Sequence, residues 1–216
     1  MLGIALIRSS LFLSLFLVVA CSSGQQAAQP AKPVATTSAA TAPVVAANKF
    51  SFDWPTPEGW KKETIPFPLE FAPTLAYEGQ EELRFGPRFF KEDSPTYFTY
   101  SFAFVLNHAP AFSTKQFESD VKTYFNGLAS AVTKETSDAS LHDASFTGSA
   151  EHFEGRVKTI DAFSKDHHVL RLHVVGESKV CGDHRIILAS LSPKDPQTDP
   201  EVWSTLAKVR ASFVCR

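Results

Sequence analysis

The clearest pattern in the chain lies in residues 97–106, where large apolar side chains alternate with small ones. With the period of two that a strand imposes, one face holds Phe98, Tyr100, Phe102, Phe104 and Leu106. The other face holds Thr99, Ser101, Ala103 and Val105, which are small and only weakly apolar. We therefore expect a central strand with a helix packed on one side.

Shorter patterns of the same kind predict further strands. They cover residues 82–85, 146–150, 153–163, 170–174 and 185–191. The second and third of these segments are separated by two residues, which predicts a hairpin.

Residues 67–71 also alternate, with phenylalanine and leucine on one face. Pro66 and Pro68 cannot donate to a sheet ladder, so this segment is expected to be an edge strand or an extended cover.

A first helix is predicted from residue 113. Ser113 followed by Gln116 has the form of a capping box, and the apolar stripe is Phe117, Val121, Tyr124, Leu128 and Val132. Gly127 lowers the helix propensity of this segment and predicts a close contact at that point.

A second helix is predicted after residue 199. Asp199 is an expected N-cap, and Pro200 occupies the first helical position, where its missing N–H costs nothing. The apolar stripe is Val202, Leu206, Val209 and Phe213.

The order of elements is thus three strands, a helix, four strands and a helix, with no repeat between the halves. This order predicts an α+β fold, an antiparallel sheet of about six to seven strands with two main helices on one or both faces. Residues 49–216 have the length of a single domain. The chain has 19 phenylalanines and one methionine, which indicates a core built largely from aromatic side chains.

The first 20 residues have the layout of a secretory signal. Arg8 is the only charge, and the apolar run Leu11–Ala20 is too short for the roughly 20 residues of a membrane-spanning helix. The segment Val18-Val19-Ala20-Cys21 resembles the lipobox of bacterial lipoproteins. The resemblance implies cleavage between Ala20 and Cys21, with thioether-linked diacylglycerol on Cys21 and a further acyl chain such as palmitate on its amine. An ordinary signal peptide cut near Ala20, leaving a free Cys21 thiol, is the alternative.

The residues after Cys21 bear on the location of the protein. Ser22 and Ser23 stand where an inner-membrane lipoprotein of enteric bacteria has aspartate, so the resemblance implies the outer membrane, with the domain in the periplasm or at the cell surface. Residues 21–48 are rich in Ala, Pro, Thr and Ser, and are expected to be a disordered tether. A peptide that a partner recognises is the alternative reading.

The charge of the folded part is mildly acidic. All 23 acids follow residue 52, against 19 bases once Arg8 and Lys32 are left out of the 21. This balance argues against a nucleic-acid partner and against a polybasic membrane surface.

Two cysteines remain after Cys21, and an even pair in an exported protein predicts a disulfide between Cys181 and Cys215. A metal-binding pair or redox thiols are the alternatives, although the spacing is not Cys-x-x-Cys.

Motifs for catalysis are not found in the sequence. The seven histidines, including His167 and His168 beside Asp166, lack the fixed spacing of zinc ligands. The sequence has neither Gly-x-Ser-x-Gly nor a glycine-rich phosphate loop. We expect no catalytic residue, no metal and no cofactor.

A binding surface is a further prediction, built on Glu82, Arg84 and Arg88 with nearby aromatic residues. Glu81 and Glu82 are neighbours on a strand, so they point to opposite faces and cannot share a proton. The simpler prediction is that these charges, with Arg84 and Arg88, line a solvated sheet face. The aromatic residues Phe89, Phe90, Trp54 and Trp60 are expected in the core or covering the sheet edge, with an apolar pocket or partner surface as the alternative.

Two short resemblances extend beyond the lipobox. Residues 57–60 (Pro-Glu-Gly-Trp), 187–192 and 203–213 resemble the start and end of PsbP-like domains. That resemblance implies an accessory role in a larger complex. Residues 81–85 (Glu-Glu-Leu-Arg-Phe) are similar to a segment of uncharacterised bacterial lipoproteins, which implies no function.

Together these features predict an envelope lipoprotein held to the membrane through Cys21, with a non-catalytic domain that binds or helps to assemble an envelope protein partner. The alternatives are a carrier of small apolar ligands and an exported enzyme without a recognisable motif. A large apolar cavity would favour the carrier, and a cleft with converging titratable groups would favour the enzyme. A filled core would favour partner binding.

Overall fold

Seven antiparallel strands form the main sheet of the computed structural model, which describes residues 50–216. The predicted signal, lipobox and tether lie outside the described residues. Across the sheet the strands run β2 (Lys61–Pro66), β3 (Gly79–Phe85), β4 (Tyr100–Leu106), β8 (His184–Ser192), β7 (Val169–Cys181), β6 (Phe153–Ile160) and β5 (Asp143–Gly148). The predicted α+β class, antiparallel sheet and strand number are confirmed.

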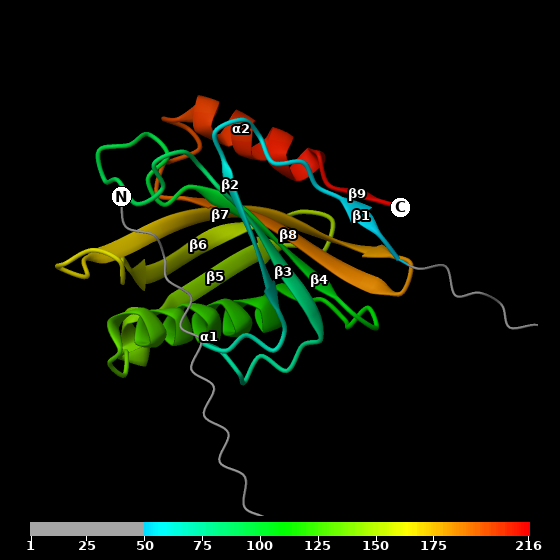
Figure 1. The fold of residues 1–216 in the computed structure, drawn as a ribbon, viewed down its shortest axis with the longest axis horizontal. Helices are drawn as coiled ribbons and strands as arrows, with labels where there is room; N and C mark the ends of the chain where they lie inside the picture. The colour runs from blue at the N-terminus through cyan, green and yellow to red at the C-terminus, as the bar shows by residue number, and fades with distance from the viewer. Residues whose placement is uncertain (1–49) are drawn as a thin grey trace, which may run out of the picture. The chain divides into compact units, whose positions relative to one another are not determined.

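The helices lie on opposite faces of this sheet (Figure 1). α1 (Thr114–Thr133) packs on β5 and β6, and α2 (Pro200–Ala211) packs on β4 and β8. A short 3₁₀ turn, η1 (Ala139–Leu141), follows α1. A second sheet of two strands joins β1 (Phe52–Asp53) to β9 (Val214–Cys215). Neither helix within residues 50–216 has the length and apolar character needed to cross a membrane.

The face under α1 carries the larger core. It contains the bulky side of β4, which includes Phe102 and Phe104, together with Phe117, Val121 and Tyr124 of the predicted α1 stripe. α1 begins as predicted, because the Ser113 hydroxyl accepts a hydrogen bond from the Gln116 N–H at 3.1 Å.

The face under α2 is narrower and partly polar. Buried hydroxyls join this part of the sheet: Ser101 of β4 pairs with Ser190 of β8 at 2.6 Å, and Thr99, just before β4, pairs with Ser192 of β8 at 2.7 Å. Small residues let α2 approach this face closely, so the strand predicted to have a helix on one side has a helix on each.

Three details differ from the predicted elements. Trp203 takes the buried place expected for Val202 in α2, because its indole N–H finds the Lys194 carbonyl at 2.8 Å. Asp199 caps α2 without a side-chain hydrogen bond. The edge strand is β2, which was not predicted and is mostly exposed, and residues 67–71 form the extended cover that was one of the two predicted alternatives.

The cover explains the glycine within α1. A Cβ on Gly127 would overlap the Phe71 carbonyl oxygen and lie 2.9 Å from the carbonyl carbon. The close contact predicted at Gly127 is therefore confirmed, and its partner is the backbone of the cover.

Gly127→Ala is expected to lower the free energy of unfolding by about 1–3 kcal/mol, because the overpacked cover must shift. Helix propensity alone predicts the opposite sign, a gain of about 1 kcal/mol. Urea unfolding measures the difference, and the reverse change at exposed Ala131, Ala131→Gly, should show only the propensity loss. A more stable Gly127→Ala protein would contradict the contact.

Candidate functional site

The three charged residues of the predicted binding surface do not share one surface. Glu82 and Arg84 lie on the same face of β3, only 6% and 3% exposed, with Oε2 and Nη1 3.1 Å apart. Arg88 lies in the loop after β3 and pairs with exposed Asp93 at 2.8 Å. The expectation of a solvated sheet face around Glu82 and Arg84 is therefore wrong. Of the three residues, only Arg88 is exposed and can take part in a surface site.

Most polar atoms of Glu82 and Arg84 are hydrogen-bonded inside the fold, and only Arg84 Nε has no partner among the described residues. The Arg84 guanidinium lies 4.4 Å from the Trp54 ring centroid and donates to the Trp54 carbonyl at 2.7 Å. The hydroxyl of Thr64 and the amide of Gln80 donate to Glu82 at 2.7 and 2.8 Å. A hydrogen-bonded pair of this kind holds the N-terminal segment against the sheet, which is a structural role.

The predicted disulfide between Cys181 and Cys215 is confirmed, with the two Cα atoms 6.0 Å apart. It ties the last strand, β9, to the end of β7. Phe50 stacks on His184 at the same end of the sheet, with ring centroids 3.9 Å apart. The described chain thus begins and ends beside the β7–β8 turn (Figure 1).

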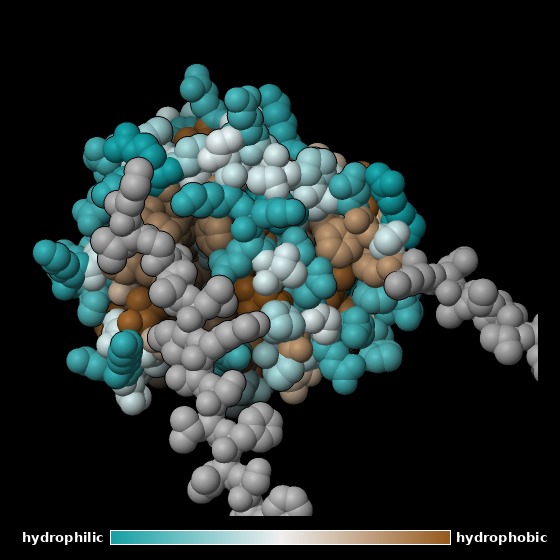
Figure 2. All heavy atoms as spheres, in the orientation of Figure 1, coloured by the Kyte–Doolittle hydropathy of each residue, from teal (hydrophilic) through white to brown (hydrophobic). Residues whose placement is uncertain are grey.

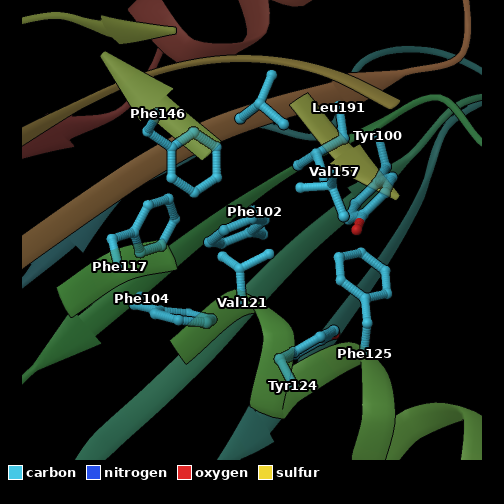
Figure 3. Close-up of a pocket in the computed structure, with 11 residues that line it drawn as sticks. Tyr100, Phe102, Phe104, Phe117, Val121, Tyr124, Phe125, Phe146, Val157 and Leu191 are labelled. Carbon is cyan, nitrogen blue, oxygen red and sulfur yellow. The ribbon is translucent and has the colours of Figure 1, made fainter. Parts of the chain in front are cut away.

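The core under α1 is filled. Aromatic rings from β4, α1 and β5 converge there (Figure 3), and the cavity between them has a volume of about 10 Å³. A second cavity, beside the segment that leads into α1, is also about 10 Å³. Each is about the size of one water molecule, so neither holds an apolar ligand.

Glu81 lies beside this aromatic core, fully buried, and neither carboxylate oxygen has a hydrogen-bond partner among the described residues. Burial raises the pKa of Glu81 to about 8, and the negative charge of Glu63 adds to this rise. The nearby Tyr124 hydroxyl acts in the opposite direction and lowers the pKa of Glu81, although the two groups are not placed for a full hydrogen bond. Burial, and then the charge of Glu81, raises the pKa of Tyr100 and of Tyr124 well above the ordinary value. These three groups form a buried titratable cluster.

A hydrogen-bonded chain joins two loops at the opposite end of the sheet from the disulfide. The Tyr97 hydroxyl donates to Asp161 and lies 3.1 Å from Nε2 of His168. Nδ1 of His168 lies 3.0 Å from Asp166. Because Tyr97 gives its only proton to Asp161, both ring nitrogens of His168 donate, and the imidazole is charged when every bond is made.

The pKa values follow this arrangement. The hydrogen bond to Asp166 raises the pKa of His168, and the same bond, with a second from Ser164, lowers the pKa of Asp166 to about 2. Burial, and then the bond to Asp161, raises the pKa of Tyr97. The complete chain is therefore present below the raised pKa of His168 and loses a bond as the pH rises through it.

Two exposed phenylalanines lie in the same two loops as this chain of hydrogen bonds. Phe90, 52% exposed, packs on Phe163, 45% exposed, with ring centroids 5.0 Å apart. Phe89 points inward and is buried, so the two neighbours in sequence divide between core and surface. Val169, 46% exposed, begins β7 at the same end. We name Phe90, Phe163 and Val169 the aromatic tip.

The polar groups beside the aromatic tip are hydrogen-bonded to one another. Tyr97 and Asp161 are buried and hydrogen-bonded to each other, and His168 is hydrogen-bonded to Tyr97 and Asp166. Within residues 50–216, no three histidine, cysteine or acidic side chains gather as metal ligands would. Around the core, apolar areas break a largely hydrophilic surface in separate places (Figure 2).

Sequence reasoning found only part of this end of the molecule. Asp166 and His168 were noted together, but Tyr97 and Asp161 are distant in sequence and meet only through the fold. No local signal separates exposed Phe90 from buried Phe89, since adjacent rings in a loop can both be buried, as Tyr97 and Phe98 are.

Comparisons with known proteins give a limited result. No protein-family model matches the chain, and no curated protein matches it. The structure of LpqN, involved in cell envelope biogenesis of Mycobacterium tuberculosis, is similar over 77% of this chain and 83% of that chain, with 8% sequence identity and a TM-score of 0.32. A likeness of this size carries no information on function.

Proposed function

We propose that this chain is an envelope lipoprotein anchored through Cys21, and that its folded domain binds or helps to assemble an envelope protein without catalysis. The filled core carries the proposal for the domain, because cavities of about 10 Å³ leave no room for a substrate or cargo. The lipobox-like segment before Cys21 supports the anchor, and Ser22 and Ser23 favour the outer membrane.

The disulfide supports an oxidising compartment, since such bonds persist in exported proteins and are rare in the cytosol. The hydrogen bonds that join Tyr97, Asp161 and His168 to one another support a role in binding rather than chemistry. His168, the most reactive type of group there, is held by acceptors on both ring nitrogens.

The anchor is tested with the full chain, expressed with its own signal and labelled with radioactive palmitate. We expect the label to enter the wild-type protein, which should fractionate with the outer membrane. Cys21→Ala should take up no label and keep its signal. Equal labelling of both proteins, or a soluble wild-type protein, would contradict the anchor.

A carrier of small ligands is a second candidate, favoured by one observation. Glu81 presents two unpaired carboxylate oxygens beside the aromatic core, so a ligand with a donor group would satisfy them if α1 moved away from the sheet. Native mass spectrometry distinguishes the two functions, because a carrier releases a small molecule on denaturation and an accessory domain does not.

A further inference from the structure

The aromatic tip stands out among the exposed apolar side chains of the described residues. Phe90 and Phe163 are in contact, although they come from different loops. The hydrogen bonds of Tyr97 to Asp161 and His168 fix these loops against each other. The tip is therefore a built feature of the fold and not a pair of loose side chains.

The area of the tip limits what it can bind. A phenylalanine buries on the order of 150–250 Å² in full contact, so the two half-exposed rings offer about 100 Å² each. A stable protein interface buries about 800 Å² on each partner. The tip is too small for such an interface, whereas a bilayer accepts a few aromatic side chains flanked by cations.

Each exposed ring has such a cation beside it in sequence. Lys91 follows Phe90 and Lys165 lies two residues after Phe163; both lysines are exposed and have no ion-pair partner within residues 50–216. Of the nearby acids, Asp93 pairs with Arg88 and Asp166 with His168, while exposed Glu92 and buried Asp161 have no ion-pair partner among the described residues. The free ammonium groups suit the phosphates of a membrane surface.

We propose that the aromatic tip is a second membrane contact, with Phe90 and Phe163 inserted among the headgroups of an anionic phospholipid bilayer and the two lysines on its phosphates. The proposal rests on the proposed function only in taking the membrane that carries Cys21 as the one contacted.

The length of the chain before residue 50 permits this contact. β7 runs from Val169 at the tip to Cys181 at the end where the described chain begins, and its 13 residues span about 43 Å. The 28 residues from 22 to 49 can span at most roughly 90–100 Å. A domain held by Cys21 can therefore turn its far end to the same membrane.

The test places a tryptophan at the tip and at a matched exposed site. The full lipid-bearing chain with Phe90→Trp, or with Val180→Trp at the opposite end, is reconstituted in phosphatidylglycerol–phosphatidylcholine vesicles with or without brominated acyl chains. Val180 is 54% exposed, which makes it a control of equal accessibility. Subtracting the parent protein removes the emission of the native tryptophans.

We expect brominated lipid to quench at least about half of the added emission in Phe90→Trp and little in Val180→Trp, since an interfacial side chain lies about 5–10 Å deep. Adding Phe163→Ser to Phe90→Trp should abolish the quenching, and adding Val214→Ser should not. Lys91→Glu with Lys165→Glu should weaken it in anionic vesicles. Equal quenching at both sites, or none at Phe90→Trp, would overturn the proposal.

Two further outcomes are separable. If a photo-crosslinker at position 90 joins a protein and not lipid in intact cells, the tip is a protein contact and the membrane proposal fails. If the wild-type chain does not float with the vesicles, the anchor of the proposed function fails; the same variants, added from solution to the same vesicles, still decide whether the tip inserts.

Discussion

Glu81→Leu is expected to stabilise the protein strongly at pH 8 and to remove most of the pH dependence of its stability between pH 5 and 8. Glu81 is fully buried without a hydrogen-bond partner among residues 50–216, and burial raises its pKa to about 8. The unfolded chain, by contrast, ionises the carboxyl near its ordinary value of 4.5.

The sign follows from the protons bound by each state. Between pH 4.5 and 8 the folded protein keeps the proton of Glu81 and the unfolded chain has lost it. The free energy of unfolding therefore falls as the pH rises, by up to about 1.4 kcal/mol per pH unit and roughly 4 kcal/mol by pH 8. A leucine has no such proton, so the gain from Glu81→Leu grows across this window.

Urea unfolding of wild type and Glu81→Leu at pH 5, 6, 7 and 8 measures this difference. Glu81→Gln should flatten the pH dependence equally but give a smaller gain, because its amide stays buried and unpaired. Glu154→Gln, at an exposed position of β6, is the control and should change neither quantity. A wild-type protein whose stability does not fall with pH relative to Glu81→Leu would show that Glu81 is solvated or paired.

Removing the disulfide is the second large effect. Cys181→Ala with Cys215→Ala is expected to lower the free energy of unfolding by about 4 kcal/mol, since the bond closes a loop with a sequence separation of 34. At 2–4 °C per kcal/mol, the Tm should fall by roughly 10 °C. The β1–β9 pairing should lose amide protection before the main sheet does, because only this bond and a few contacts fix the C-terminal strand.

Reduction of the wild-type protein provides an internal control. Dithiothreitol should lower the wild-type Tm to that of the double variant and leave the double variant unchanged. If the double variant is as stable as the oxidised protein, the disulfide adds no stability to that of two other contacts. These are the packing of Trp54 on Phe213 and the 2.8 Å hydrogen bond from the Trp54 indole to the Val209 carbonyl.

The sheet and its helices were predictable because their signals are local. The alternation in residues 97–106 fixes the faces of β4, and the turn residues 164–166 separate β6 from β7 in the sequence as in the fold. Trp203 was missed as a core residue of α2 because its burial depends on a distant carbonyl, which periodicity does not report.

The site residues were predicted less well because their surroundings come from other elements. Glu81 shares a face with Leu83 and Phe85, so the strand period did carry a signal for its burial. The charge of the glutamates in this strand favoured a solvated face, and it predicted burial less well than the strand period did. For Arg84, burial depends on Trp54, 30 residues away, and no local pattern indicates that pairing.

Native mass spectrometry of the full chain, extracted from the membrane of cells that process its signal, tests the central claim most directly. The account predicts a protein that begins at Cys21, carries diacylglycerol and acyl mass on that residue, contains one disulfide and releases no small molecule on denaturation. A protein with a free Cys21 thiol, or one that releases a bound ligand, would contradict an anchored, non-catalytic accessory domain.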